Sequence, residues 1–146
     1  MEYSVGRAGR VVVARLFEGE PLAASVEEIA RREKIESAAV LITGGIRRAD
    51  VVVGPLEEKP KIVGDFRSFE GPGESLGVGT IYCDENGPKL HIHAAMAKGE
   101  KVVAGCPRGG ASVFLVMEVT IIEILGVDAR RRPDDCGLNL LRCGRA

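Results

Sequence analysis

Residues 89–106, KLHIHAAMAKGEKVVAGC, decide the fold that we expect for this chain. Residues 89–97 and 101–106 have the composition of β-strands, and a turn at Lys98-Gly99-Glu100 separates them. Two strands joined by so short a turn pair antiparallel. The same stretch contains both histidines of the 146-residue chain and one of its four cysteines, which raises the question of a metal site.

The segments before this hairpin predict one helix and more strands. Residues 10–17, RVVVARLF, are rich in β-branched residues and predict a strand. In residues 21–34, apolar residues recur at helical spacing between charged ones, which predicts an amphipathic helix with Pro21 in its first turn. Four further strands are predicted at residues 37–46, 49–54, 61–66 and 74–83, followed by a hairpin signal at Asn86-Gly87.

The segments after the hairpin complete the predicted fold. Residues 111–125, ASVFLVMEVTIIEIL, predict a long strand with apolar residues in both alternating sets, which must be covered on both faces. One helix covers one face, so a neighbouring subunit is the expected cover of the other. Residues 130–146 predict an irregular polar tail, whose leucines can dock it onto the rest of the protein. One helix and about eight strands predict an α+β fold with a mostly antiparallel sheet, in a single domain of residues 1–146.

The overall charge argues against a dedicated nucleic-acid-binding domain. The formal net charge is -1 and the isoelectric point is near 6.2, whereas phosphate binding usually requires a basic excess. The first ten residues lack the apolar core of a secretory signal, and no apolar run is long enough for a membrane helix. We therefore expect a cytoplasmic protein with no membrane partner and with reduced thiols.

Local basic clusters could still contact nucleic acid weakly. Two of them, Arg7 with Arg10 and Arg47 with Arg48, lie in the first half of the chain. The third consists of Arg130, Arg131 and Arg132. A solvated charged face is the alternative interpretation of each cluster. The sequence contains no phosphate-binding loop, nucleophile elbow or dinucleotide fingerprint.

The two histidines are spaced to share one face of a strand. Residues i and i+2 of a strand point to the same side, so His91 and His93 project together. Their Cα atoms are expected roughly 6.5 Å apart, and two imidazoles at that spacing can bind one ion with bonds of about 2.1 Å. Two polar residues on a solvated face, with no ion, are the alternative.

The length of the following turn decides whether Cys106 joins the histidines. A two-residue loop at Lys98-Gly99 pairs Cys106 with His91, and a four-residue loop pairs it with His93. A three-residue loop turns the thiol to the other face. Two of the three registers therefore build a His-His-Cys set, which suits Zn²⁺ with a fourth position open.

The preceding hairpin predicts partners for the imidazoles. A turn at Asn86-Gly87 is expected to pair Tyr82 with His91 and Thr80 with His93, and these hydroxyls could accept the distal imidazole N–H groups. The other three cysteines are expected to have no ligand role, since one should face away from the histidines and two lie in the tail; they are Cys83, Cys136 and Cys143.

These residues resemble a known family, the plant and prokaryote conserved (PPC) domain. LHIHAAMAKGEKVVAGC resembles the family signature L-H-[LIV]-H-[AV]-x-[LM], a turn and V-V-G-G-H. RLFEGEPL resembles the opening R-L-x-x-G-E-x-[LI], and FEGPGESLGVGTI resembles F-E-G-P-x-E-x-L-x-x-x-G-x-I. RRPDDCGLNLL resembles the closing P-x-x-G-L-x-L-L, so the resemblance covers nearly the whole chain.

The resemblance implies a curved antiparallel sheet assembled as a homotrimer. Plant relatives carry separate AT-hooks for DNA and use this domain for trimerisation and for nuclear partners. Prokaryotic members are usually the bare domain and are often described as DNA-binding. The two signature histidines and a later histidine look like a metal site, and the related fold of acetolactate decarboxylase carries a three-histidine zinc site.

This sequence departs from the family pattern at two places. Cysteine, which is also a competent zinc ligand, replaces the third signature histidine at Cys106. The plant partner-binding hexapeptide G-R-F-E-I-L corresponds to residues 71–76, where only Gly71, Glu74 and Leu76 match. The plant transcription-factor interaction is therefore not expected here.

The sequence thus leads to one main hypothesis and two alternatives. We expect a homotrimeric PPC-type protein that associates with DNA and carries a zinc or small-ligand site at His91, His93 and Cys106. The first alternative is a metal-dependent enzyme similar to acetolactate decarboxylase. The second is a structural trimerisation module whose polar cluster has no chemical role.

Overall fold

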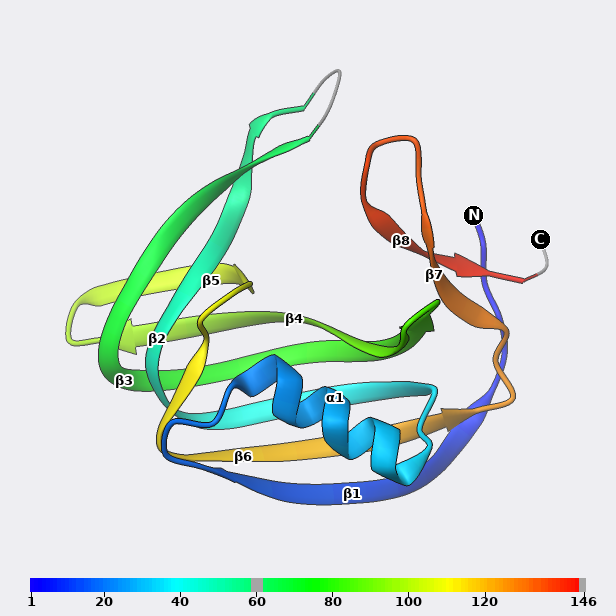
Figure 1. The fold of residues 1–146 in the computed structure, drawn as a ribbon, viewed down its shortest axis with the longest axis horizontal. Helices are drawn as coiled ribbons and strands as arrows, with labels where there is room; N and C mark the ends of the chain where they lie inside the picture. Colours follow the sequence, from blue (N-terminus) through cyan, green and yellow to red (C-terminus); the bar gives the residue numbers. More distant parts are fainter. Residues whose placement is uncertain (59–61, 145–146) are drawn as a thin grey trace.

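The computed structural model describes residues 1–58 and 62–144 (Figure 1). One residue of the predicted strand at 61–66 and two residues of the predicted tail lie outside the described residues. The elements in chain order are β1 (Arg7–Phe17), α1 (Leu22–Glu33), β2 (Ser37–Glu57), β3 (Val63–Asp84), β4 (Gly87–Lys98), β5 (Lys101–Pro107), β6 (Ser112–Leu125), β7 (Ala129–Pro133) and β8 (Asn139–Cys143). The prediction of a mostly antiparallel sheet with one helix is confirmed.

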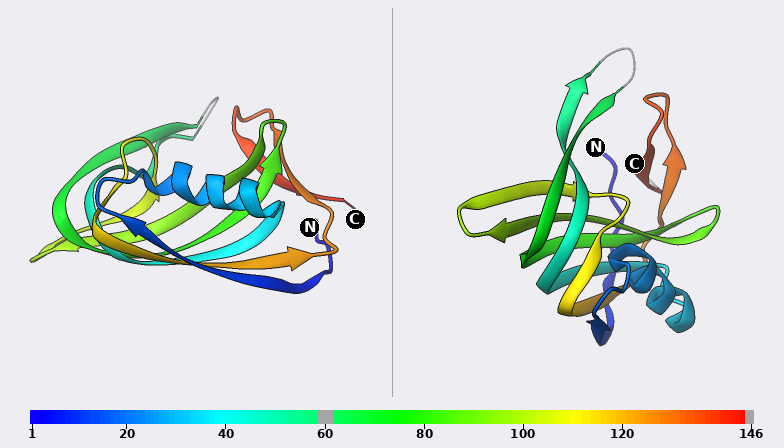
Figure 2. Two further views of the ribbon diagram at one scale, coloured as in Figure 1. Left: turned by 60° about the horizontal axis from the view of Figure 1, so that its bottom comes forward. Right: turned by 60° about the vertical axis from the view of Figure 1, so that its left-hand side comes forward.

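Six strands form one antiparallel sheet in the order β1-β6-β2-β3-β4-β5. The sheet bends so far that β5 also pairs with β2, with Val51 opposite Pro107 and Val52 opposite Cys106. Figures 1 and 2 show β2 and β3 as long curved strands that leave the body together as an arm. This bending brings the end of β5 between the arm and β4.

The long strands β2 and β3 correct the sequence prediction of shorter ones. Separate strands were predicted at residues 37–46 and 49–54, but β2 continues through both, and β3 continues from Val63 to Asp84. The pairing of β2 with β3 shifts register between Ile46 and Arg48. Such irregularities bend a strand pair without ending it. Several glycines and prolines, which usually mark the end of a strand, therefore lie inside these bent strands.

The prediction of an irregular tail is wrong for the residues described. β7 and β8 form a two-stranded antiparallel sheet, in which Ala129 lies opposite Cys143 and Pro133 opposite Asn139. Gly137 lies before β8 with a φ of +81°, a conformation that glycine adopts without strain. An isolated hairpin is only marginally stable. Contacts between β7 and β3 therefore explain why the β7–β8 hairpin forms although its polar sequence does not predict strands.

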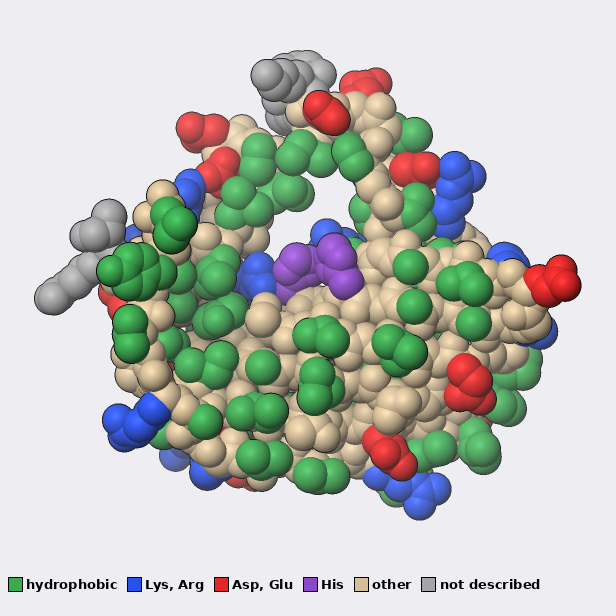
Figure 3. Space-filling model, turned by 180° about the vertical axis from the view of Figure 1, so that it is seen from behind, with side chains coloured by type: hydrophobic (Ala, Val, Ile, Leu, Met, Phe, Trp, Pro, Cys, Tyr) green, Lys and Arg blue, Asp and Glu red, His purple; other side chains and the backbone are tan. Residues whose placement is uncertain are grey.

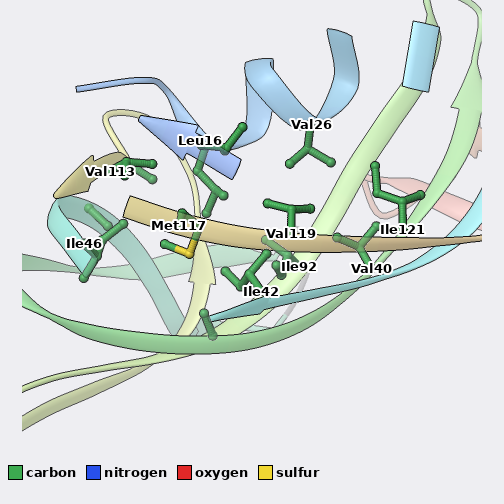
Figure 4. Close-up of a cluster of buried hydrophobic side chains, with 14 of the residues drawn as sticks. Leu16, Val26, Val40, Ile42, Ile46, Ile92, Val113, Met117, Val119 and Ile121 are labelled. Atoms are coloured by element: carbon green, nitrogen blue, oxygen red, sulfur yellow. The ribbon is translucent and has the colours of Figure 1, made fainter. Parts of the chain in front are cut away.

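The helix covers one face of the sheet, and the core lies between them (Figure 4). Its buried residues Leu22, Val26 and Ala30 recur at the spacing that places them on one side of a helix. The carboxylate of Glu27 accepts a hydrogen bond of 3.1 Å from the backbone N–H of Leu90, which ties α1 to β4. The labelled core side chains of Figure 4 are Leu16, Val26, Val40, Ile42, Ile46, Ile92, Val113, Met117, Val119 and Ile121.

The opposite face of the sheet, which we call the open face, has no helix over it in the described chain, and the β7–β8 hairpin packs against its end at Thr80 and His91. Strand β6 contributes to the open face through an irregularity at Leu115, whose φ of +59° breaks the alternation of side chains. Val113 and Met117 are therefore both buried, whereas Leu115 between them is exposed. Among the described helices, none has the length and apolar character needed to cross a membrane.

Candidate metal centre and ligand pocket

Strands β4 and β5 bring the two histidines and one cysteine together. Lys98 pairs with Lys101 across a two-residue turn, and Gly99 in that turn has a φ of +59°. Continued along both strands, this register sets Cys106 opposite His93. It is the register predicted for the four-residue loop, although a two-residue turn produces it.

The three side chains form a compact set of possible ligands. The candidate ligand atoms of His91, His93 and Cys106 all lie within 4.8 Å of one another. The imidazole centroids are 5.1 Å apart, with the rings nearly perpendicular at 81°. Both histidines are exposed, whereas Cys106 is buried at 5% exposure. The thiol therefore forms the floor of the cluster, and the imidazoles face the solvent.

Gly105 allows the close approach that positions Cys106. A Cβ atom at Gly105 would lie 2.3 Å from the carbonyl oxygen of Val52 and 3.0 Å from the side chain of Val51. The backbone hydrogen bond from the N–H of Arg108 to the carbonyl of Asp50 is 2.7 Å long and holds the following residues against β2. Only glycine fits at position 105 without displacing one of the two strands.

The predicted partners of the imidazoles require a correction. Asp84 pairs with Gly87, so Thr80 lies opposite His91 rather than His93, and Tyr82 lies opposite Lys89. The loop is one position earlier than predicted, which moves the register by two residues. In the described chain, neither predicted hydroxyl accepts a hydrogen bond from an imidazole; the Thr80 hydroxyl instead accepts one of 3.4 Å from Arg131.

The surroundings of the cluster are partly desolvated and positively charged. Burial raises the pKa of the Cys106 thiol, while Arg108, Arg131 and the backbone N–H of Ile92 act in the opposite direction. Burial also lowers the pKa of His91, and the positive charges of Arg131, His93 and Arg108 lower it further. Burial therefore acts against the charged form of both groups, and metal binding requires the thiol to lose its proton.

A large apolar pocket opens beside the histidines. Its volume is about 1000 Å³, and His93 and Cys106 lie in its wall together with Arg108. Its apolar wall residues include Val52, Val53, Ile62, Phe66, Leu76 and Val78. Figure 3 shows the histidines inside a hollow that hydrophobic side chains surround and that basic side chains adjoin.

A second pocket lies on the other side of the cluster. It has a volume of about 590 Å³ and is lined by His91, Thr80 and Arg131, and by the tail leucines Leu140 and Leu141. Arg108 and Leu138 line both pockets. The His-His-Cys cluster thus lies between two hollows, one beneath the β2–β3 arm and one beneath the β7–β8 hairpin.

The predicted basic residues differ in their surroundings. Arg47 pairs with Glu18, and its guanidinium carbon lies 5.0 Å from the centre of the Phe114 ring. Arg130 pairs with Glu36 at 3.6 Å. Arg48 and Arg132 are exposed, without an ion pair among the described residues. Arg131 differs from them, since it is half-buried and lies near the candidate ligands His91 and Cys106.

Arg108 and the apolar wall of the pocket were not predicted from the sequence. Arg108 follows Cys106 by two residues, so its position in the chain was a usable signal. The wall comes mainly from β2 and β3, far from the histidines in sequence, and no local pattern indicates it. The remaining cysteines, Cys83, Cys136 and Cys143, lie outside the cluster of candidate ligands and are unpaired.

The fold and this cluster define a class of protein: an α+β fold in which helix α1 covers one face of an antiparallel sheet, with potential metal ligands on the other face. Within that class, the chain belongs to the Plants and Prokaryotes Conserved (PCC) domain family, whose model matches residues 3–125. The resemblance seen in the sequence is therefore confirmed. A search of curated proteins gives no significant match.

Solved structures of similar fold come from archaea and bacteria. A PPC protein of Pyrococcus horikoshii has a TM-score of 0.85 and 23% identity, with 100% of both chains covered. A metal-containing protein of Archaeoglobus fulgidus has a TM-score of 0.83 and 24% identity, with 96% of this chain and 98% of that one covered. A Ralstonia eutropha protein described as a "putative DNA-binding protein" has a TM-score of 0.72 and 20% identity, with 88% of each covered. At these identities the likeness shows the fold alone.

Proposed function

We propose that this chain is a metal-binding protein in which His91, His93 and Cys106 hold one divalent ion, best matched by zinc, at the edge of a ligand pocket. The observation that supports the proposal is the convergence of three ligand atoms within 4.8 Å of one another. A tetrahedral zinc ion with bonds of about 2.0 to 2.3 Å has neighbouring ligand atoms roughly 3.3 to 3.8 Å apart. The candidate ligand atoms would therefore have to approach by up to about 1 Å, and both imidazoles that would move are exposed.

The chemistry of the donors favours zinc over harder cations. Two imidazoles and one thiolate suit zinc, whereas magnesium and calcium prefer oxygen ligands. Three protein ligands leave a fourth position for water or for a bound molecule. When bound there, the ion would supply Lewis-acid polarisation to a ligand. The likeness to a metal-containing protein of Archaeoglobus fulgidus is consistent with this proposal.

Zinc retention by matched variants tests the proposal. The wild-type protein, loaded with zinc and then dialysed, should retain about one ion per chain, whereas His93→Ala and Cys106→Ser should retain little. Cys136→Ser removes a thiol outside the cluster and should behave like the wild type. Circular dichroism would establish that each variant is folded. Full zinc retention by the folded Cys106→Ser variant, or none by the wild type, contradicts the proposal.

A cobalt titration provides a spectroscopic control. Cobalt(II) bound to a thiolate absorbs in the near ultraviolet, and that absorption should disappear in Cys106→Ser but persist in Cys136→Ser. The measurement identifies the ligand rather than only the stoichiometry. A thiolate band that survives in Cys106→Ser would place the ion elsewhere.

We also propose that the chain assembles as a homotrimer through the open face. Large apolar side chains remain exposed on its strands outside the ligand pocket, among them Val13 at 78%, Leu115 at 66% and Leu41 at 45%. Apolar surface of this kind is typical of protein interfaces, and a closed threefold assembly would cover it without forming fibres. Light scattering should give the mass of three chains at micromolar concentration, and a stable monomer would contradict the proposal.

DNA association is a second candidate function, favoured by fold relatives described as DNA-binding. The net charge of -1 and the dispersed arginines predict weak, non-specific binding, with a Kd above roughly 1 μM at physiological salt. Neutralising Arg48 and Arg132 should then flatten the dependence of binding on salt, because each neutralised phosphate contributes to that slope. Sequence-selective nanomolar binding in fluorescence anisotropy at physiological salt would make DNA recognition the main activity instead.

A further inference from the structure

Two arginines lie beside the His-His-Cys cluster and have no carboxylate partner among the described residues. Arg108 lines both pockets, and Arg131 lines the pocket next to His91. The positive charges of both act on His91 and on Cys106. Neither arginine forms an ion pair within the described residues, in contrast to Arg10, Arg47, Arg130 and others.

Arg131 is the less satisfied of the two. It is half-buried, its Nε atom is buried without a hydrogen-bond partner, and one Nη atom donates a hydrogen bond of 3.4 Å to Thr80. Burial is the main cause of the lowered pKa of its guanidinium. A buried guanidinium with an unmet donor is costly unless an anion accepts from it.

Neighbouring charges do not neutralise this region. Lys89 also lines the second pocket, but it pairs with Glu27 at 3.4 Å. Asp84 lines the same pocket, and one of its oxygens accepts a hydrogen bond of 2.7 Å from the backbone N–H of Asn86. The Asp84 carboxylate also favours the charged form of Arg131, but burial, Tyr82 and Arg108 each affect that guanidinium more.

A bound dication increases the positive charge further. Two guanidinium groups and one divalent ion carry four positive charges, and the Cys106 thiolate supplies one negative charge. The fourth position of the ion and the two arginines therefore favour the same kind of ligand, an anion. A planar carboxylate matches the fork of an arginine side chain and can also bind zinc.

The shape of the site adds a second requirement. His93, Cys106 and Arg108 lie in the wall of the apolar pocket of about 1000 Å³, at the end next to the second pocket, which Arg131 lines. A ligand with its acid group at that end would lay any apolar part along Val52, Phe66 and Val78. Burial of apolar area would then add to the affinity, which distinguishes such a ligand from a free inorganic anion.

We propose that this site binds a small organic acid, with its carboxylate at Arg108 and Arg131 beside the metal cluster and its apolar part in the adjoining pocket. The proposal rests on the proposed function for the charge of the metal ion, but the two arginines and the pocket exist without it. It identifies the class of ligand that the fourth position takes.

Calorimetric titration with matched probes tests the proposal. Hexanoate should bind the zinc-loaded protein, while hexanol, which has the same apolar chain without the charge, should bind at least tenfold more weakly. Arg131→Gln and Arg108→Gln should each weaken hexanoate binding about 10- to 100-fold, the range expected for losing a hydrogen bond to a charged group. Arg48→Gln, which removes an arginine outside both pockets, should leave it unchanged, and Arg131→Lys should weaken it less than Arg131→Gln.

The outcomes separate this proposal from the metal site. Hexanoate binding that persists in metal-free protein and still depends on both arginines supports the organic-acid site even if zinc is not retained. Zinc retention without hexanoate binding overturns the organic-acid proposal and leaves the metal site intact. Equal binding of hexanol and hexanoate also overturns it.

Two further probes identify the source of the anion. Inorganic phosphate that binds as tightly as hexanoate would show that the apolar pocket contributes nothing, and would overturn the proposal. A short DNA duplex that binds through Arg108 and Arg131 while hexanoate does not would assign the arginines to nucleic-acid phosphates instead. A cobalt-loaded sample should also show a change in its visible spectrum with hexanoate and none with hexanol.

Discussion

The two faces of the sheet carry similar apolar residues but differ in what covers them. On the helix-covered face, Val40 and Ile121 are completely buried, whereas Val13 and Val78 on the open face are 78% and 63% exposed. The histidines lie on the open face as well. The covered face therefore stabilises the fold of the single chain, and the open face is available for ligands and for a neighbouring subunit.

The largest effect is expected on the covered face. Ile121→Ala removes a fully buried side chain and should lower the free energy of unfolding by about 2 to 5 kcal/mol. Val102→Ala, at a position 62% exposed on β5, should change it by less than about 0.5 kcal/mol. Urea denaturation of both variants would measure the contrast, and equal losses would mean that the open face is covered in solution.

A somewhat smaller effect is expected where the sheet closes. A Cβ atom at Gly105 would meet the Val52 carbonyl, so Gly105→Ala should cost roughly 1 to 3 kcal/mol. It should also reduce zinc retention, because β5 must shift and carries Cys106 with it. Gly109→Ala is the matched control, since an added Cβ atom there meets nothing within 4 Å. A Gly105→Ala variant as stable as wild type would show that β5 does not need its close contact with β2.

Acid should weaken one ion pair at the margin of the covered face. Hydrogen bonds and charge from Arg10 lower the pKa of Glu123 to about 2. A carboxylate whose pKa is lowered in the folded chain stabilises the fold at pH values above its ordinary pKa of 4.5. This stabilisation is lost as the pH falls from 4.5 toward 2. Glu123→Gln should therefore reduce thermal stability at pH 7 and flatten its decline between pH 5 and 2.

The exposed Glu100, in the turn between β4 and β5, provides the control for that measurement. Glu100→Gln should leave both the stability at pH 7 and the acid profile close to those of the wild type. An acid profile for Glu123→Gln that is superimposable on the wild-type profile would contradict the role given to the Arg10 pair.

The smallest effect on the fold is expected on the open face. Val13→Ser removes apolar surface that is exposed in the single chain. The free energy of unfolding of the single chain should therefore change little. If a neighbouring subunit covers this face, however, the assembly should weaken. Analytical ultracentrifugation across a range of concentrations would show smaller species for Val13→Ser than for the wild type. An unchanged assembly would place the subunit contact elsewhere.

Much of the site could be predicted from the sequence because its determinants are local. The two-residue period of a strand places His91 and His93 on one side whatever the rest of the chain does. The turn at Gly99 allowed few registers, and one of them set Cys106 opposite His93 as the structure does. The partners of the imidazoles were assigned wrongly because moving a turn by one position moves the paired residues by two.

The sequence by itself determined the helix, most of the strands, the antiparallel pairing and the shared face of the histidines. Only the tertiary structure decided that β5 returns to β2, that Arg131 comes from the tail to the cluster, and that Val52, Phe66 and Val78 form a pocket beside it. Propensity and periodicity act over a few residues and are legible in the sequence. Contacts between distant segments depend on how far the sheet bends. That bend results from many small packing interactions along several strands, and no single segment encodes it.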